Sequence, residues 1–400
     1  MTSRALRTYR NIPAWRRASG VVAIALASVV VAACAPSTGS ASKGAAQPTA
    51  TANVDNNFSL ESLIAAAKKE GSVTVYDSSG SVTEVAKAFT AKYGIKATGV
   101  KSKVGDTLQK MTREAQANNV TIDATFYEDG PTLVSQLLPQ KIVYTWVPAD
   151  LSATIPSKNP LVLLQKANVW VYNTKLFPKG CPVTNVWDLV DPKWKGKVSM
   201  QDPLGKPNLI EYFTQLTRGG NDQLKSAYQA KTGQELTTKE SSAALEWVKQ
   251  LAKNKPILTS ADEDVAAAVA SPNQTQPRVG LMSVSKFRDV EDKGYPMAAC
   301  VGMTPWSGFE YPKYAAIATH TKHPNAAKLF VRFALTEPGI MPEASDGGGI
   351  SGNSDVGQIG KSPEGLSDWN KQLFVYDSKY LLDDAQGAQD MQDFWRLNHK

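Results

Sequence analysis

From residue 58 onward, helical and strand patterns alternate along the chain, and this alternation constrains the fold more than any other feature of the sequence. Apolar side chains recur at helical spacing over residues 60–67 and 82–89, and Gly71 and Gly94 follow these two segments. Residues 73–76 and 95–100 have the composition of strands. The pattern continues to about residue 138 and predicts an α/β protein with layered helices and a largely parallel sheet.

The N-terminus has the three marks of a secretory signal. Five arginines and no acidic residue occur in residues 1–34, residues 21–33 are apolar or small, and Cys34 follows. The apolar run is shorter than the roughly 20 residues that a membrane span needs. Its last four residues, VAAC, resemble a bacterial lipobox, in which the cysteine becomes the lipid-bearing first residue of the mature protein. We therefore expect residues 1–34 to be a lipoprotein signal peptide, a palmitate-type anchor at Cys34, and a protein exported to the outer face of the cell membrane.

Removing this leader changes the meaning of the net charge. The formal charge is +7, but without the five leader arginines 39 basic residues remain against 37 acidic ones. A nearly balanced body gives little support for nucleic-acid binding. Residues 35–57 are small and polar, so they are expected to form a flexible tether between anchor and body.

Two cysteines remain after Cys34, namely Cys181 and Cys300. In an oxidising compartment an even remainder indicates a disulfide, which would close a loop of about 120 residues and contribute roughly 4–5 kcal/mol in the chain-entropy model. Two separate buried thiols are the alternative. The sequence has no CxxC motif, and His320 and His323 have no supporting carboxylate pattern, so we expect neither a metal nor a cofactor.

Five segments, taken in order, resemble the extracellular solute-binding proteins of ABC importers, in particular the ferric-binding branch. The resemblance covers nearly all of residues 58–400. The most specific segment is TNVWDLVDPKWKGKVSMQDP at residues 184–203. The others lie at residues 63–71, 88–96, 123–126 and 323–339.

The resemblance implies a two-lobed periplasmic-binding-protein-like fold of type 2, with strands crossing between the lobes at residues 163–172 and 297–305. Lobe 1 would comprise residues 58–165 and 301–400, with C-terminal helices packing across both lobes, and lobe 2 residues 166–300. A solute would bind in the cleft, and closure would be sensed by an ABC permease and its ATPase. The protein would act as a monomer and perform no chemistry.

Candidate ligand-binding residues lie where strands end and helices begin, because ligands of open α/β sheets bind at the carboxyl ends of strands. Each also has a structural alternative as a helix cap, a solvated turn or a surface charge. The candidates are Asp77, Ser78, Ser79, Tyr127, Glu128, Asp202, Lys206, Ser283, Ser285, Arg288, Trp306 and Asp346. A glycine run, residues 347–349, is expected either to let the backbone approach the ligand or to form a mobile loop.

The chain departs from the ferric-binding pattern in one respect. Those relatives place two adjacent tyrosines near residues 283–288, and this sequence has none there. Ferric iron needs hard oxygen ligands such as phenolate. We therefore expect a small polar or anionic solute of the phosphorylated, phosphonate or carboxylate type, with ferric iron as the alternative. A secreted enzyme that uses Asp77, Glu128 or Asp129 as acid and base is a further alternative, although no partnered nucleophile is evident.

Overall fold

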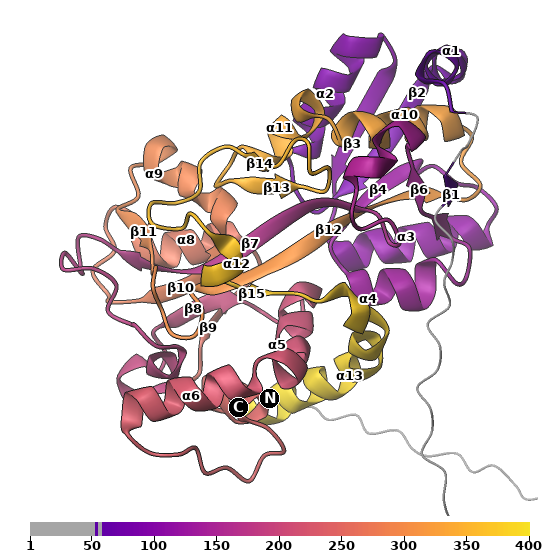
Figure 1. Ribbon diagram of the computed structural model, residues 1–400. Helices are drawn as coiled ribbons and strands as arrows, with labels where there is room; N and C mark the ends of the chain where they lie inside the picture. The colour runs from indigo at the N-terminus through magenta and orange to yellow at the C-terminus, as the bar shows by residue number, and fades with distance from the viewer. Residues whose placement is uncertain (1–52, 55–57) are drawn as a thin grey trace, which may run out of the picture. The chain divides into compact units, whose positions relative to one another are not determined.

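The computed structural model describes residues 53–54 and 58–400 (Figure 1). The predicted signal peptide with Cys34, and the predicted tether apart from two residues, lie outside the described residues. Those two residues form strand β1 (Asn53–Val54), which pairs in parallel with β6 (Trp146–Val147). Asn53 and Val54 therefore belong to the folded body and not to a free linker.

The first part of the body confirms the predicted alternation. Ser59 caps the first helix by accepting a hydrogen bond from the Ser62 N–H, and Gly71 ends it with a positive φ of 80°. Gly94 ends the second helix in the same way. The elements are α1 (Leu60–Glu70), β2 (Ser72–Asp77), α2 (Val82–Tyr93), β3 (Lys96–Lys101), α3 (Val104–Gln116) and β4 (Ala124–Tyr127).

A single large sheet runs through the described chain, with its two longest strands at the centre (Figure 1). These are β7 (Val162–Asn173) and β12 (Gly308–Ala318), which pair antiparallel. On one side lie β4, β2 and β3. On the other lie β10 (Val279–Ser283), β8 (Val198–Gln201) and β9 (Ile257–Thr259). Pairing is parallel within each side and antiparallel at the centre, so the expectation of a largely parallel sheet holds only for the two halves.

The predicted first crossing agrees with β7, but the predicted return at residues 297–305 is wrong. That segment contains only the short β11 (Met297–Ala299), which pairs with the far end of β7. The return strand is β12, which is buried along its whole length. Its sequence, GFEYPKYAAIA, hides the strand pattern because a glutamate, a proline and a lysine interrupt the apolar residues.

Each half of the sheet has its own apolar core, and helices cover both. One core gathers around Phe89 and Phe330, and the other around Trp187, Phe213 and Trp247. The remaining longer helices are α5 (Pro207–Gly219), α6 (Asn221–Thr232), α7 (Ala243–Lys253), α8 (Asp262–Ala270), α10 (Pro324–Ala334), α11 (Glu337–Ala344) and α13 (Leu381–Asn398). Within residues 53–54 and 58–400, no helix has both the length and the hydropathy needed to cross a membrane.

The short elements complete the chain between these helices. The short strands are β5 (Val143–Tyr144), β13 (Gly349–Ser351), β14 (Gln358–Ile359) and β15 (Phe374–Val375). The short helices are α4 (Gly130–Thr132), η1 (Leu133–Leu137), η2 (Ala149–Thr154), η3 (Val186–Val190), η4 (Pro192–Trp194), η5 (Val284–Phe287), α9 (Arg288–Asp292), α12 (Trp369–Gln372) and η6 (Ser378–Tyr380). Helix α13 contacts both sides of the sheet, because Leu381 packs with Tyr314 while Trp395 stacks on Phe213 at 5.6 Å between ring centroids.

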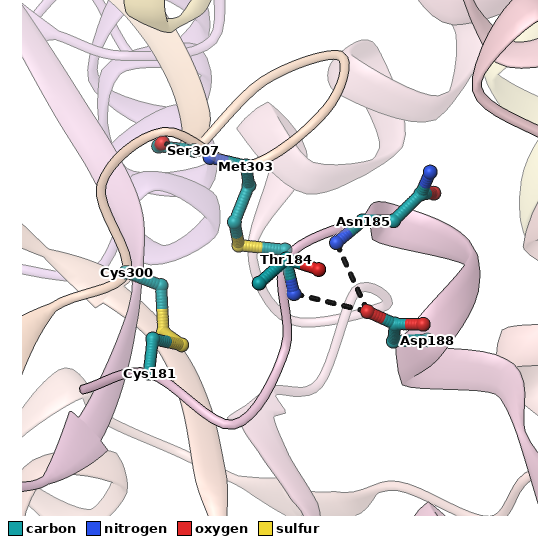
Figure 2. The surroundings of a disulfide bond; sticks show 7 residues. All are labelled: Cys181, Thr184, Asn185, Asp188, Cys300, Met303 and Ser307. Atoms are coloured by element: carbon teal, nitrogen blue, oxygen red, sulfur yellow. Dashed lines mark hydrogen bonds between the residues drawn. A yellow bond between two sulfur atoms is a disulfide. The ribbon is translucent and has the colours of Figure 1, made fainter. Parts of the chain in front are cut away.

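Cys181 and Cys300 form a disulfide whose Cα atoms are 5.2 Å apart and which joins positions 119 residues apart (Figure 2). It ties the loop before η3 to the residue that follows β11. Beside it, the Asp188 carboxylate accepts hydrogen bonds from the backbone N–H groups of Thr184 and Asn185. The bridge and this cap hold the start of the 184–203 motif against the sheet.

Candidate functional site

A cavity of about 870 Å³ opens where the strands of both halves of the sheet end. Its walls come from the segments after β2, β3, β4, β8, β9 and β10, as expected for the carboxyl ends of strands. Lys166 and Tyr311 of the two crossing strands line it as well, as do residues at the end of α11. Segments far apart in the sequence therefore meet at one site.

Nine of the twelve predicted site residues line this cavity, namely Ser78, Ser79, Glu128, Asp202, Lys206, Ser283, Ser285, Arg288 and Asp346. Three do not. Asp77, the last residue of β2, is buried and contacts Lys313. Tyr127 is buried in an apolar cluster beside β12, and Trp306 packs edge-on against Phe374.

Four α-helices, α2, α3, α5 and α8, begin at the cavity wall. Their N-cap residues Ser81, Lys103, Lys206 and Ala261 all line the cavity. In the part of the chain that the structure describes, none of the four caps accepts a hydrogen bond with its side chain. Each helix N-terminus carries the equivalent of about half a positive charge, so together the four favour an anion. Some first-turn N–H groups are already used, since Thr83 donates to the Gly80 oxygen and Leu209 to the Lys206 oxygen, and Pro207 has no N–H.

Most charged side chains of the wall are already paired with one another. Lys206 contacts Asp262 at 3.1 Å, Lys286 contacts Glu263 at 2.6 Å, and Arg288 contacts Asp346. Burial alone would raise the pKa of Glu263, but the Lys286 ammonium lowers it to about 2. Glu263 is therefore ionised, and each of these three cations lies against a carboxylate.

The wall carries two further lysines. Lys101 and Lys103 are exposed at the cavity and form no ion pair with any described residue. They add positive charge beside the start of α3.

Beneath the cavity lies a buried ionic cluster, defined here as Lys166, Lys313, Asp77, Glu128 and Glu343. The Lys313 ammonium is fully buried and lies 2.8 and 3.0 Å from the two Asp77 oxygens and 3.3 Å from Glu128, and it also contacts Glu343. Lys166 donates to Glu343 at 3.0 Å. Lys166, Lys313 and Glu343 were not predicted as site residues, because isolated charges within an apolar strand or a helix belong to no sequence motif.

Two carboxylates of the cluster have pKa values shifted in opposite directions. Burial raises the pKa of Asp77 to about 7, since the attraction of Lys313 is offset by Glu343 and Glu128. Burial would also raise the pKa of Glu343, but Lys166 and Lys313 lower it to about 2. The cluster therefore holds Glu343 ionised and takes up a proton at Asp77 near neutral pH.

The glycine run does not approach the cavity in the way the sequence suggested. A Cβ atom at Gly347, where φ is +79°, would lie only 2.3 Å from the backbone oxygen of Val284. The missing side chain thus allows this segment to pack against the protein's own backbone after β10, next to the Arg288–Asp346 pair.

The cavity offers carboxylates but little phenolate as possible ligands for iron. Tyr311 is the tyrosine that lines it, and burial raises the pKa of its phenol well above the usual value. Among residues 53–54 and 58–400, no group of three or more His, Cys, Asp or Glu side chains could hold a metal ion. His320 is exposed, whereas His323 is partly buried and contacts Asp123 and Ser72, at the opposite end of β2 from the cavity.

No curated protein sequence matches this chain. Solved structures with similar folds include iron-bound HitA from Pseudomonas aeruginosa, with 18% identity and a TM-score of 0.62 over 82% of this chain and 99% of that one. AfuA from Actinobacillus pleuropneumoniae, with fructose-6-phosphate bound, has 20% identity and a TM-score of 0.62 over 82% and 99%. The apo ferric ion-binding protein A of Pasteurella haemolytica has 15% identity and a TM-score of 0.61 over 82% and 98%. These likenesses show the two-lobed binding-protein fold.

The sequence also matches a family model over residues 84–373, which is well over half of the chain. The matched region includes both crossing strands and every cavity segment except the one that follows β2. This chain belongs to the bacterial extracellular solute-binding proteins, which act in ABC importers.

Proposed function

We propose that this protein captures a small anionic solute in the cavity and delivers it to an ABC permease. The observation that carries the proposal is the convergence of four helix N-termini, without side-chain caps in the described chain, on one cavity. Phosphate, phosphonate and carboxylate groups accept hydrogen bonds from such N–H groups and are attracted by the helix dipoles.

The distribution of side-chain charge supports the same ligand class. The acidic residues Asp262, Glu263 and Asp346 are paired with cations, whereas Lys101 and Lys103 are free of ion pairs among the described residues. A solute anion would therefore meet the unpaired positive charge of Lys101 and Lys103 at the wall. Among the described lining carboxylates, Asp202 forms no ion pair and accepts a hydrogen bond from the Leu204 N–H. AfuA, whose structure contains fructose-6-phosphate, provides a precedent on the same fold.

The geometry favours an organic anion over ferric iron. HitA was solved with iron bound, so the fold accommodates both kinds of cargo. Iron, however, would require ionised oxygen ligands, and here the Tyr311 phenol is buried while most cavity carboxylates are already engaged by lysine or arginine.

The carboxylates considered for catalysis also have structural partners. Asp77 and Glu128 contact Lys313, and Asp129, the N-cap of α4, accepts hydrogen bonds from Thr132. Their engagement supports a role in binding and architecture over acid–base chemistry.

The sequence supports the cellular setting of this function. A lipid at Cys34 would keep a monomeric receptor on the outer face of the membrane, close to the permease and its ATPase. The lobes that close on the solute would be residues 58–165 with 301–400, and residues 166–300. Lining segments from both ranges give the solute contacts on each lobe, which would stabilise the closed form.

A thermal-shift screen of the purified protein tests the proposal. The panel comprises sugar phosphates, phosphonates, sugar acids, polyamines and ferric citrate. A ligand that binds only the native state raises the melting temperature, and at 100 times its Kd it adds about 2.7 kcal/mol. We expect stabilisation by at least one organic anion. Stabilisation by ferric citrate but not by citrate alone, with no response to the other anions, would contradict the proposal.

A further inference from the structure

The cavity is lined by polar atoms whose hydrogen-bonding capacity is not used. Asn208, at the start of α5, is 2% exposed, and both of its side-chain amide atoms lack a partner in the described chain. Glu343 Oε2 is likewise buried and without a hydrogen-bond partner among these residues. Because buried polar groups in native proteins are nearly always hydrogen-bonded, such atoms in a ligand cavity indicate groups that the ligand supplies.

The donor and acceptor types indicate which ligand groups fit. The Asn208 amide offers a donor and an acceptor, and the ionised Glu343 offers an acceptor. Lys166 is buried, lines the cavity and donates one hydrogen bond to Glu343, which leaves further N–H groups for a ligand. A hydroxyl group both donates and accepts, so a ligand with more than one hydroxyl can satisfy all three side chains. A ligand ammonium could only donate and would face the Lys166 charge, whereas an alkyl group would leave every one of these atoms unsatisfied.

We propose that Asn208, Glu343 and Lys166 form a hydroxyl-binding subsite, and that the solute is a polyhydroxylated anion such as a sugar phosphate or sugar acid. This inference rests on the proposed function, because the helix N-termini bind the anionic group while the subsite binds the carbon chain. The cavity volume of about 870 Å³ agrees with a polyhydroxylated ligand. It lies within the range of volumes of pockets that bind organic ligands, and it is far larger than the volume of a bare inorganic anion.

Matched ligand pairs test the subsite by isothermal titration calorimetry. One pair is glucose 6-phosphate with n-hexyl phosphate, and the other is gluconate with hexanoate. The members of each pair share an anionic group and a six-carbon skeleton. We expect at least one hydroxylated member to bind at least about 100-fold more tightly than its alkyl partner, because the alkyl chain leaves buried polar atoms unpaired. Equal or tighter binding of the alkyl members would overturn the subsite but leave anion capture intact. Failure of all four to bind would count against both proposals.

Substitution of Asn208 provides the second test, with Asn168 as its control. Asn168 in β7 is equally buried, and its amide atoms also lack partners among the described residues, but it does not line the cavity. Asn208→Leu removes no hydrogen bond of the amide atoms in the unliganded protein, so the melting temperature should hold or rise. We expect it to weaken binding of the preferred hydroxylated ligand at least about tenfold, with little effect on its alkyl partner. Asn168→Leu should change neither affinity.

The two variants also separate a binding role from a purely structural one. If Asn208→Leu weakened both members of a pair equally, Asn208 would only shape the cavity. If Asn168→Leu lowered the affinity for the hydroxylated ligand as much as Asn208→Leu, the effect would not arise from ligand contact. Either result would overturn the assignment of Asn208 to the subsite.

Discussion

Replacement of Lys313 by methionine tests whether the buried ionic cluster beside the cavity stabilises the folded protein. Met is close to Lys in length but has no charge, so the substitution removes the ammonium that contacts Asp77, Glu128 and Glu343. Lys166 would remain as the one cation of the five-residue cluster. Removing one partner from a buried ion pair costs about 3–5 kcal/mol, because the remaining charges lose their compensation.

The expected shift in melting temperature follows from the size of the body. Unfolding entropies near 2.1 cal/mol/K per residue give roughly 0.7 kcal/mol/K for about 340 residues. Lys313→Met should therefore lower the melting temperature by about 4–7 °C at pH 8. The deficit should shrink toward pH 5, because carboxylates that have lost Lys313 gain protons at higher pH than before and become neutral.

Differential scanning calorimetry between pH 5 and pH 8 is the assay. Lys87→Met is the matched control, since Lys87 forms a solvent-exposed ion pair with Glu84. This substitution should shift the melting temperature by no more than about 1 °C. An unchanged melting temperature for Lys313→Met would show that the cluster contributes no net stability. A deficit that is the same at every pH would show that lost packing, and not lost charge compensation, is responsible.

Three further predictions concern the cluster, the disulfide and the cavity wall. The pKa of Asp77 is raised to about 7 in the folded protein, from the usual value of 3.8 for an aspartate. The contribution of Asp77 to stability is therefore present at low pH and is lost as the pH rises through 7. Asp77→Asn should therefore gain stability relative to the wild type between pH 4 and pH 8 in thermal melts, and a constant difference would contradict this reasoning. Replacing both Cys181 and Cys300 by alanine should lower the melting temperature by about 6 °C, from a loop-closure contribution of roughly 4–5 kcal/mol. Alkylation of Cys181 or Cys300 by iodoacetamide in the unreduced wild type, located by peptide mass spectrometry, would argue against the bridge. Lys103→Gln should weaken anion binding about threefold or more and reduce its salt dependence, measured by titration at two ionic strengths, while the melting temperature stays unchanged.

The sequence predicted the elements whose pattern is local. Helices such as α1 and α2 show apolar spacing and a terminal glycine, and they begin and end within two residues of the expected positions. Of β12, only residues 315–318 were predicted as a strand. The earlier part was missed because its burial on both faces permits Glu310, Pro312 and Lys313, whose type is set by tertiary partners. The return crossing was therefore placed at residues 297–305.

The same distinction applies to the site. Segments that follow strands were predictable, because the carboxyl ends of strands are where α/β sheets bind ligands. Residues that reach the cavity from crossing strands or from a helix C-terminus, such as Lys166, Tyr311 and Glu343, have no such position in the sequence. Asp77 was identified for the right loop, but the alternation of β2 turns its side chain inward to Lys313.

A crystal structure of the protein with the tightest-binding phosphorylated ligand from the thermal-shift screen tests the central claim most directly. The phosphorus position can be located by its anomalous signal. We predict phosphate oxygens about 2.7–3.2 Å from the first-turn backbone N–H groups of at least one of α2, α3, α5 and α8, inside the cavity. A phosphate bound elsewhere on the surface, with the cavity unoccupied, would contradict the account.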